Sequence, residues 1–453
     1  MFAPLQNWQV RAIGVGIILC AIVASAVLPL FASGGMIPIY MKATDRYLAG
    51  EQFYLPNEPP AYTYPPAMIL TTVPLAVFPE YGWRALNWLE NFSLAAGLIA
   101  LATVMVWPVI AADGPPLRDR RYLIAATVVT ILCLKYIISP IKYQAHDLMV
   151  VVAVGGAALA MSRSNDKWGG LLGGMAAALK ATPMLLLPVL VMQRRVVASM
   201  TFGTAVLVLT LLPDLFVASP DDATWAQSWY SRFVSKTSVG EAAEGDGAWT
   251  AWNALNQSIP GTMYRLMTPV ETGGELKNVA IADLGGRTAK LIVLLIEVAV
   301  FGFIVLTCRR SPLLDAGPLR SFYWMGAAGV VLCGMLLLSP MSSTQHFCAL
   351  CLPIAFFTVH YFFIRRTWVA LAGMSAVMLG GPLASQDLVG ETYSSWAQAA
   401  GSATIVTIAC MVSTGVLLLS DRKRSEQIFA RFESDSSSPN RDEAIISPPA
   451  AAA

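Results

Sequence analysis

Long apolar stretches separated by short polar connections cover most of this chain. They are rich in Leu, Ala, Val and Gly and do not alternate between apolar and polar positions, which indicates helices rather than strands of a barrel. A helix needs about 20 apolar residues to cross a bilayer, so we predict an all-α polytopic membrane protein with roughly nine to twelve membrane segments. The apolar runs lie near residues 12–32, 67–79, 92–110, 122–139, 147–161, 169–192, 196–213, 288–308, 322–338, 347–364, 367–383 and 401–420.

Two of these runs are irregular. The run at 67–79 is too short for a straight span, and it follows the proline pair of Tyr64–Pro66. The run at 169–192 is broken at Lys180–Pro183, where a charge and a proline meet. In lipid every backbone polar group must be paired, so an irregular segment has to lie at the water boundary or line a cavity within the protein. We therefore expect both segments to border a cavity.

Composition supports the membrane assignment. Of the 453 residues 56% are hydrophobic and 13% are charged, whereas a soluble domain carries about 25% charged residues. The net charge of +2 is too small to indicate a nucleic-acid partner. The stretch from Ala12 to Phe31 reads as a first transmembrane helix and signal anchor rather than a cleaved signal peptide. The seven cysteines lie inside or at the ends of apolar runs, which predicts buried thiols without a disulfide framework or a metal site.

The distribution of basic residues predicts the orientation. Lys and Arg concentrate in cytoplasmic connections, and the clusters here are Arg118–Arg121, Arg163 with Lys167, Arg194–Arg195, Arg309–Arg310, Arg365–Arg366 and Arg422–Arg424. The charge-poor or acidic connections are then expected outside, at 33–66, 214–286, 339–346 and 384–400. The polar, Ser- and Pro-rich stretch 421–453 predicts a disordered cytoplasmic tail, which leaves 1–420 as one membrane domain.

Polar and ionisable side chains at membrane depth are costly, and this makes them candidates for function. They form five groups: Lys42, Asp45, Arg46, Glu51, Glu58 and Tyr64; Lys142–Asp147; Lys180; Asn256–Ser258; and Ser339–His346.

Most of these groups also have a purely structural interpretation. Asp45 is spaced to pair with its helical neighbours, and Asp147 can cap a helix. Asn256–Ser258 is formally an N-glycosylation sequon. His360 fits an interfacial anchor. Lys180 is different, because a lysine midway along an apolar run has to face water or an anion.

The sequence contains no phosphate-binding glycine-rich loop and no nucleotide-binding domain. The large outer connections and the lack of an internal repeat also argue against a simple transporter. An enzyme of this kind has to draw on a donor that is already in the membrane. A cation such as Lys180 suits a lipid-linked phosphate, and carboxylates in an outer loop suit removal of a proton from a sugar hydroxyl.

Taken in order, these stretches resemble the polyprenyl-phosphate-dependent glycosyltransferases of family 87, within the GT-C superfamily. Tyr40–Gly50 followed by Tyr62–Pro66 is similar to the family's first loop and its entry to the second helix. The family's later elements are matched by Gln144–His146, by Leu179–Pro183 with Gln193–Arg195, by Asn256–Ser258 and by Ser339–His346.

The resemblance implies a GT-C bundle with a catalytic cavity at the outer face of the inner cell membrane. It also implies transfer of a hexose or pentose, mannose first, from a polyprenyl-phosphate sugar to a glycolipid or glycan acceptor of the envelope, with no cofactor or metal. On this basis we assign catalysis to Asp45, Glu51 and Glu58. Donor or acceptor binding is assigned to Tyr40, Arg46, Tyr64, Gln144, His146, Lys180, Asn256, Gln257 and His346.

The chain departs from the family at the start of the first loop. An acidic residue is expected a few positions before Tyr40, and Met36–Ile39 stands there instead. Three explanations are open: Asp45 or another carboxylate of the same loop does its work, Asp147 or His346 substitutes, or the chain is catalytically altered. The last explanation leaves an alternative function, a transport or assembly protein in the export of envelope glycans.

Overall fold

The computed structural model describes residues 7–27, 35–55, 58, 61–112, 120–242, 249–269 and 278–434, and all regular structure in these residues is helical. The seven helical segments that are long and apolar enough to cross a membrane are Glu80–Ala112 (α4), Arg120–Lys142 (α5), Val196–Phe216 (α9), Gly286–Cys308 (α12), Arg320–Leu337 (α14), Thr344–Ile364 (which contains α15, Cys351–Val359) and Ser402–Arg422 (α18). The shorter apolar helices are Ala12–Val23 within α1 (Asn7–Val27), Pro66–Leu75, Asp147–Ser162 (α6), Thr182–Met192 and Trp368–Gly380 (α16). These segments confirm the prediction of an all-α polytopic membrane protein.

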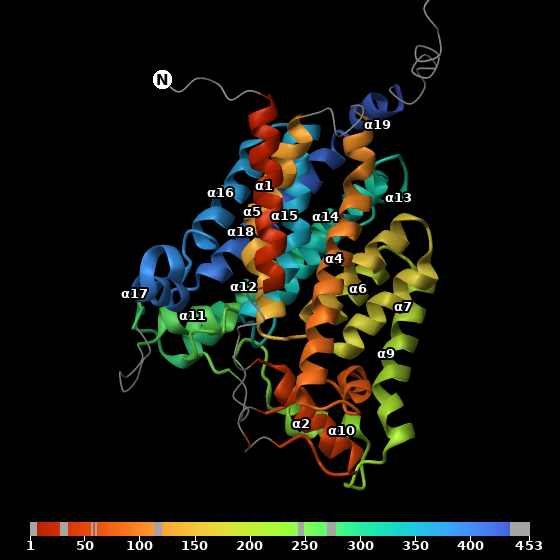
Figure 1. Cartoon of the computed structure of the whole chain (residues 1–453), viewed down its shortest axis with the longest axis vertical. Coiled ribbons are helices and arrows are strands. Elements are labelled where there is room, and N and C mark those ends of the chain that lie inside the picture. Colours follow the sequence, from red (N-terminus) through yellow and green to blue (C-terminus); the bar gives the residue numbers. More distant parts are fainter. Residues whose placement is uncertain are drawn as a thin grey trace, which may run out of the picture.

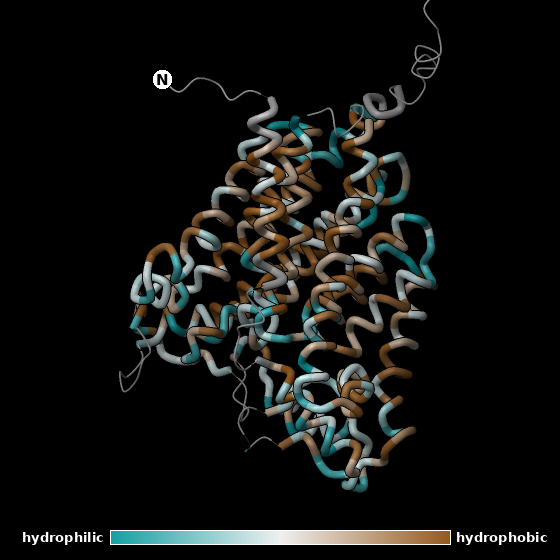
Figure 2. The backbone as a smooth tube through the Cα atoms, viewed as in Figure 1, coloured by the Kyte–Doolittle hydropathy of each residue, from teal (hydrophilic) through white to brown (hydrophobic). Residues whose placement is uncertain are grey.

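The bundle is organised around α14. Every residue from Phe322 to Leu337 is buried, as expected for a helix that is apolar on all sides and lies at the centre of a bundle. Figure 1 shows α1, α4, α5 and α15 running in similar directions around it, with α6, α7 (Asp166–Leu179) and α9 on one side and α16 and α18 on the other. In Figure 2 hydrophobic positions follow these helices, and hydrophilic positions gather toward the two ends.

The segment 169–192 is broken after Leu179, as the sequence predicts, and it turns back so that Arg195 beyond its end pairs with Asp166 at the start of α7. Helix α7 ends at Leu179, a 3₁₀ turn spans Thr182–Leu185, and α8 covers Leu186–Met192. Helix α7 packs closely on α9 through glycines. A Cβ atom on Gly174 would lie 2.4 Å from the carbonyl oxygen of Phe202, so only a glycine fits here. Small residues at four-residue spacing allow two helix backbones to approach each other this closely. The packing fixes the end of α7 against the rest of the bundle.

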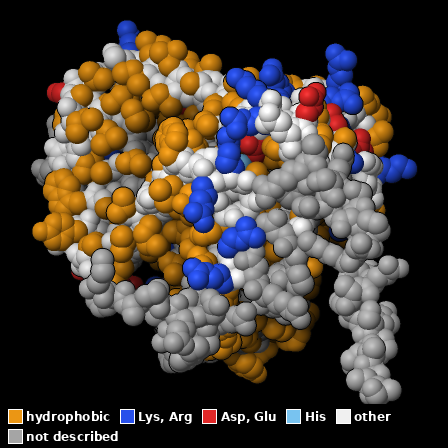
Figure 3. Space-filling view, turned by 90° about the horizontal axis from the view of Figure 1, so that it is seen from above, with side chains coloured by type: hydrophobic (Ala, Val, Ile, Leu, Met, Phe, Trp, Pro, Cys, Tyr) orange, Lys and Arg blue, Asp and Glu red, His pale blue; other side chains and the backbone are white. Residues whose placement is uncertain are grey.

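The basic clusters meet at one end of the bundle, which we call the basic end. Arg422 donates to the carbonyl of Arg309 at 3.2 Å, and Arg320 donates to the hydroxyl of Ser164 at 3.0 Å. Figure 3 shows Lys and Arg side chains gathered on this face. The arrangement agrees with the prediction that the clusters lie on one side of the membrane.

The four predicted outer connections meet at the opposite end, which we call the loop end. Gln52 of the first connection donates to Asp221 of the second at 2.8 Å. Gln257 donates its backbone N–H to Ser342 at 2.7 Å and its side-chain amide to the carbonyl of Gln398 at 2.6 Å. The short helices of this end include α2 (Ile37–Leu48), α10 (Trp225–Arg232), α11 (Ile259–Met267) and α17 (Gln386–Ala399), and Figure 1 places α2 and α10 at its tip.

Two structural expectations need correction near the C-terminus. The tail was expected from residue 421, but α18 continues to Arg422 and α19 covers Ser425–Ser434, and the rest of the expected tail, 435–453, lies outside the described residues. His360 is fully buried rather than interfacial, and its Nε2 atom lies 2.8 Å from Oδ2 of Asp421. The carboxylate of Asp421 is thus a buried partner of His360, and this contact holds the end of α18 in the bundle. The cysteines are free thiols, buried except for Cys20.

Candidate functional site

The break after α7 directs Lys180 into the protein. Lys180 adopts an extended backbone (φ −149°, ψ 121°), which ends the helix at Leu179. Pro183 has no backbone N–H to donate to the carbonyl of Leu179, and its ring would clash with that carbonyl in a helix, so a regular α-helix cannot continue through this point. The Lys180 side chain is only 16% exposed. A buried ammonium group requires an anionic partner.

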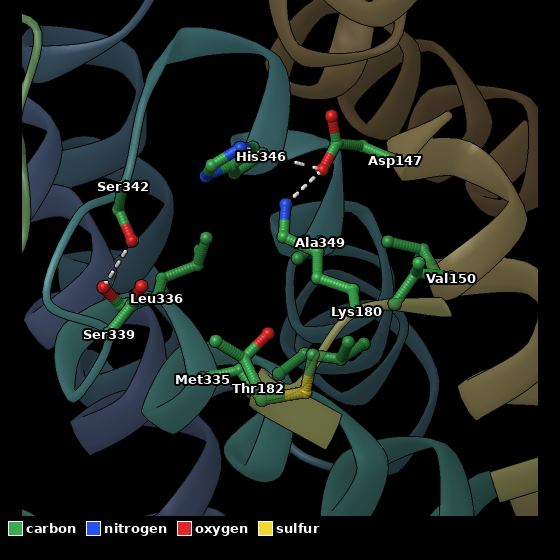
Figure 4. Close-up of a pocket in the computed structure, with 12 residues that line it drawn as sticks. Asp147, Val150, Lys180, Thr182, Met335, Leu336, Ser339, Ser342, His346 and Ala349 are labelled. Carbon is green, nitrogen blue, oxygen red and sulfur yellow. Dashed lines mark hydrogen bonds and ion pairs between the residues drawn. The ribbon is translucent and has the colours of Figure 1, made fainter. Parts of the chain in front are cut away.

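That partner is Asp147, the first residue of α6. The Nζ atom of Lys180 lies 2.5 Å from Oδ1 of Asp147, whose side chain is 5% exposed. Nε2 of His346 lies 3.7 Å from the same oxygen, and Nδ1 of His346 accepts the backbone N–H of Ser343 at 3.1 Å. A neutral His346 therefore carries its proton on Nε2, toward the carboxylate. Figure 4 shows the three side chains converging from different elements.

These three groups line a pocket at the loop end. It encloses about 330 Å³, including its open mouth. The remaining lining is mostly apolar and comes from α6, the 3₁₀ turn at Thr182, α14 and the polar kink 339–346 with the residues just after it: Val150, Val151, Thr182, Leu332, Met335, Leu336, Ser339, Ser342 and Ala349. A cation, an imidazole and hydroxyl groups in the lining of an otherwise apolar pocket suit a ligand with an anionic head and an apolar tail.

Asn256 and Gln257 support the wall of this pocket. The Asn256 side chain accepts the backbone N–H of Ser342 at 3.2 Å and donates to the carbonyl of Pro340 at 3.1 Å. Gln257 donates its backbone N–H to Ser342, as described above. Both side chains are buried. The glycosylation interpretation of Asn256 is therefore wrong, because its amide nitrogen is engaged inside the protein.

Tyr40, Tyr54, Tyr62 and Tyr64 of the first connection form an aromatic wall, which contacts His146, the residue before Asp147. The hydroxyl of Tyr40 donates to that of Tyr64 at 3.0 Å, and the hydroxyl of Tyr54 donates to the carbonyl of Tyr64 at 3.0 Å. The Tyr40 ring centroid lies 4.8 Å from that of His146. Burial raises the pKa of Tyr40 and Tyr64 above its ordinary value, so both hydroxyls stay protonated and act as hydrogen-bond donors.

The three carboxylates predicted to be catalytic lie outside this pocket. Asp45 and Glu51 are exposed. Glu58 forms ion pairs with Arg46, at 2.5 Å, and with Lys42. Hydrogen bonds from Arg46 and then from Lys42 lower the pKa of Glu58 to about 2, which makes it a weak proton acceptor. The carboxylate that does lie in the pocket is Asp147.

Other predicted residues reach the site indirectly, and one acidic residue was missed. Gln144 has a positive φ of 49° and accepts a hydrogen bond from Arg84 at 3.3 Å. Glu90 of α4 was not singled out by the sequence, yet its Oε1 lies 3.8 Å from Nδ1 of His146. The signal that could have found it is the helical spacing of Asn87, Glu90 and Asn91, three polar residues next to an apolar run. Among the described residues no cluster of His, Cys, Asp and Glu is arranged to hold a metal ion.

Comparisons with known proteins identify one family. The model of glycosyltransferase family 87 matches residues 62–345, more than half of the chain. Among solved structures, the chain is similar to the crystal structure of ArnT from Cupriavidus metallidurans bound to undecaprenyl phosphate. The two share 12% sequence identity, the likeness covers 89% of this chain and 77% of that chain, and the TM-score is 0.40. No curated protein matches the chain.

Proposed function

This chain belongs to glycosyltransferase family 87, and from that membership we propose which reaction the pocket supports. The protein is a multi-pass membrane glycosyltransferase that depends on a polyprenyl-phosphate donor. We propose that it moves a hexose or pentose, mannose in the first place, to a glycolipid or glycan acceptor at the loop end of the bundle, on the outer face of the membrane. The observation that carries this proposal is the Lys180 ammonium, only 16% exposed, in the lining of a mostly apolar pocket.

Lys180 is placed to stabilise the leaving phosphate. In a polyprenyl-phosphate sugar the phosphate is a diester with one negative charge. When the bond between the anomeric carbon and the phosphate oxygen breaks, the electron pair stays on that oxygen and the phosphate gains a second charge. A fixed ammonium group then binds the departing phosphate more tightly than the bound donor, and this is how an electrostatic contact accelerates a reaction. His346 supports Lys180 with a second donor, the Nε2–H group.

In this proposal Asp147 orients the cations. It contacts both Lys180 and His346 through one oxygen, so it holds the two donors in place while the site is empty. The donor phosphate then joins Asp147 as a second anionic partner of Lys180. Tyr40 and Tyr64 form the aromatic wall beside the sugar, and Asn256 and Gln257 keep the polar kink that carries His346 in position.

The assignment of the first-loop carboxylates remains a prediction. Asp45 and Glu51 are exposed, and Glu58 is neutralised by Lys42 and Arg46. Their positions favour acceptor binding over proton transfer. The proton of the acceptor hydroxyl must then be accepted by another group inside the site.

The test is transfer of label by the purified protein in lipid vesicles. Polyprenyl-phosphate donors with radiolabelled mannose, arabinofuranose or glucose are supplied in turn, together with a lipid extract and a glycan fraction of the envelope. We expect one donor to label one acceptor class. Donor binding without transfer to any acceptor would refute the enzymatic proposal and support the alternative role in transport or assembly, which the missing acid at Met36 favours.

A further inference from the structure

A buried imidazole next to the pocket has no hydrogen-bond partner. His146 precedes α6 and is 1% exposed, and neither of its ring nitrogens is hydrogen-bonded within the described residues. A buried polar group without a partner costs about 1–3 kcal/mol and therefore requires an explanation. In a site that is closed until its substrates arrive, a hydrogen bond to a substrate is one such explanation.

A carboxylate lies behind this imidazole. Oε1 of Glu90 is 3.8 Å from Nδ1 of His146, and the Glu90 side chain is 28% exposed. Glu90 lies on the face of α4 that carries the buried amides of Asn87 and Asn91. A carboxylate beside one ring nitrogen orients the ring and stabilises its protonated form, so the other nitrogen becomes a better proton acceptor.

The imidazole lies between the two substrate-facing parts of the site. Its ring packs on Tyr40 of the aromatic wall, and the next residue is Asp147, the partner of Lys180. The backbone N–H of Met36 donates to the carbonyl of Tyr143 at 2.7 Å. The segment that carries His146 is thus fastened to the start of α2, where the first connection lacks a carboxylate.

The protonation state of His146 suits a base. Burial lowers its pKa to about 4, so the ring is neutral at physiological pH and can accept a proton. The same burial weakens the ring as a base, and the carboxylate of Glu90 has to offset this loss. The titratable groups around it are Glu90 from α4, Tyr40 and Tyr64 from the first connection, and Asp147 on its own helix, with Lys180 and His346 beyond that carboxylate. A proton on His146 is therefore stabilised by two neighbouring carboxylates, those of Glu90 and Asp147.

We propose that His146 is the general base of the transfer reaction and that Glu90 is the residue that positions it. This inference rests on the function proposed above. The acceptor oxygen forms a bond to the anomeric carbon, the bond from that carbon to the phosphate oxygen breaks, and the hydroxyl proton moves to a ring nitrogen of His146. The imidazolium is stabilised by Glu90, and its proton leaves to solvent on the exposed side of that carboxylate.

The other carboxylates near the pocket are weaker candidates for this role. Asp147 is already bound to Lys180 at 2.5 Å, and Glu58 is bound to Lys42 and Arg46. A carboxylate that is paired with a cation gives up part of that interaction when it accepts a proton. His146 loses no hydrogen bond when it does so.

The experiment compares His146→Gln and Glu90→Gln with a matched control. Glutamine keeps the size and the hydrogen-bonding capacity of both side chains but does not accept a proton. The control is Glu297→Gln, which changes a half-buried glutamate of α12 outside the pocket. Single-turnover transfer from the donor that the wild-type protein accepts is measured in vesicles from about pH 3 to pH 8, a range that brackets the lowered pKa of His146, together with donor binding.

We expect His146→Gln to lower kcat about 100- to 10,000-fold, the usual contribution of a general base, with donor affinity unchanged. Glu90→Gln is expected to lower kcat less and to move the acid limb of the pH profile to lower pH, because the imidazolium has lost its stabilising charge. The control is expected to match the wild type in both rate and profile.

Several outcomes would overturn the inference while leaving the proposed function intact. A His146→Gln protein that transfers sugar at the wild-type rate excludes a base at this position. If His146→Gln fails to fold, Glu90→Gln provides the test. A pH profile of Glu90→Gln that coincides with that of the wild type excludes His146 as the base and Glu90 as the residue that positions it. A wild-type protein that transfers no sugar from any donor refutes the proposed function instead.

Discussion

The ammonium group of Lys180 lies 2.5 Å from Oδ1 of Asp147, although the two residues are 33 positions apart in the sequence. Each stands at the end of a helix, Lys180 just after α7 and Asp147 at the start of α6. The pair closes a pocket at the loop end of the bundle, and His346 contacts the same carboxylate. This relationship leads to two of the predictions that follow.

Lys180→Met is expected to weaken use of the donor phosphate. A hydrogen bond to a charged group contributes about 1.5–3 kcal/mol, which corresponds to a loss of roughly 10- to 100-fold in kcat/KM for the donor. Methionine keeps the length of the side chain but leaves the buried Asp147 carboxylate without its ammonium partner, so donor use is measured at a temperature where both proteins are still folded. The matched control is Lys135→Met in α5, another lysine that is partly buried, donates to the carbonyl of Gly381 and lies outside the pocket. Equal losses in both variants would mean that Lys180 has no special role.

Asp147→Asn is expected to destabilise the protein, because it leaves the Lys180 ammonium buried without a counterion. Breaking a buried ion pair from one side costs about 3–5 kcal/mol. The double variant with Lys180→Met removes the unpaired charge and should recover part of this loss. Thermal unfolding of the four proteins in detergent measures the coupling energy. If the two single changes add up in the double variant, the contact contributes nothing to stability.

Asp45→Asn and Glu51→Gln test whether the first connection supplies the base. Both side chains are exposed, and exposed substitutions usually change free energies by no more than about 0.5 kcal/mol. Sugar transfer at saturating acceptor should therefore stay within about threefold of the wild-type rate, since 0.5 kcal/mol is little more than a factor of two. A variant that keeps donor binding but loses transfer by orders of magnitude would return the role of base to this loop.

The sequence predicts those features that depend on local patterns. Hydropathy reveals the membrane helices, the proline after Lys180 reveals the break in 169–192, and the Arg clusters reveal a common end of the bundle. The resemblance to the family singles out His146, Lys180 and His346 as site residues. In the structure Lys180 and His346 contact the carboxylate of Asp147, and His146 is the residue before it.

Features that depend on how the helices are rotated against one another could not be predicted. In the sequence Asp147 is one polar residue among several. Only the packing of α6 and α7 brings its carboxylate to Lys180. Glu90 stands near the start of a membrane helix, and only the packing of α4 on α6 brings it to His146. Asp421 looked like the first residue of a tail because its partner His360 lies 61 positions away, on a different helical segment.

The contact between α7 and α9 yields a prediction about stability with a built-in control. A Cβ atom on Gly174 would lie 2.4 Å from the carbonyl oxygen of Phe202, whereas one on Gly203 of α9 would meet no atom within 4 Å. Gly174→Ala should therefore push α7 away from α9 and lower the unfolding temperature in detergent, by an overpacking cost of about 1–3 kcal/mol. Gly203→Ala should leave stability unchanged or raise it by up to about 1 kcal/mol, because alanine favours a helix more than glycine does. Since α7 ends one residue before Lys180, Gly174→Ala should also reduce sugar transfer at temperatures where the protein is still folded. Equal stability of the two variants would show that this close approach does not hold the break in place.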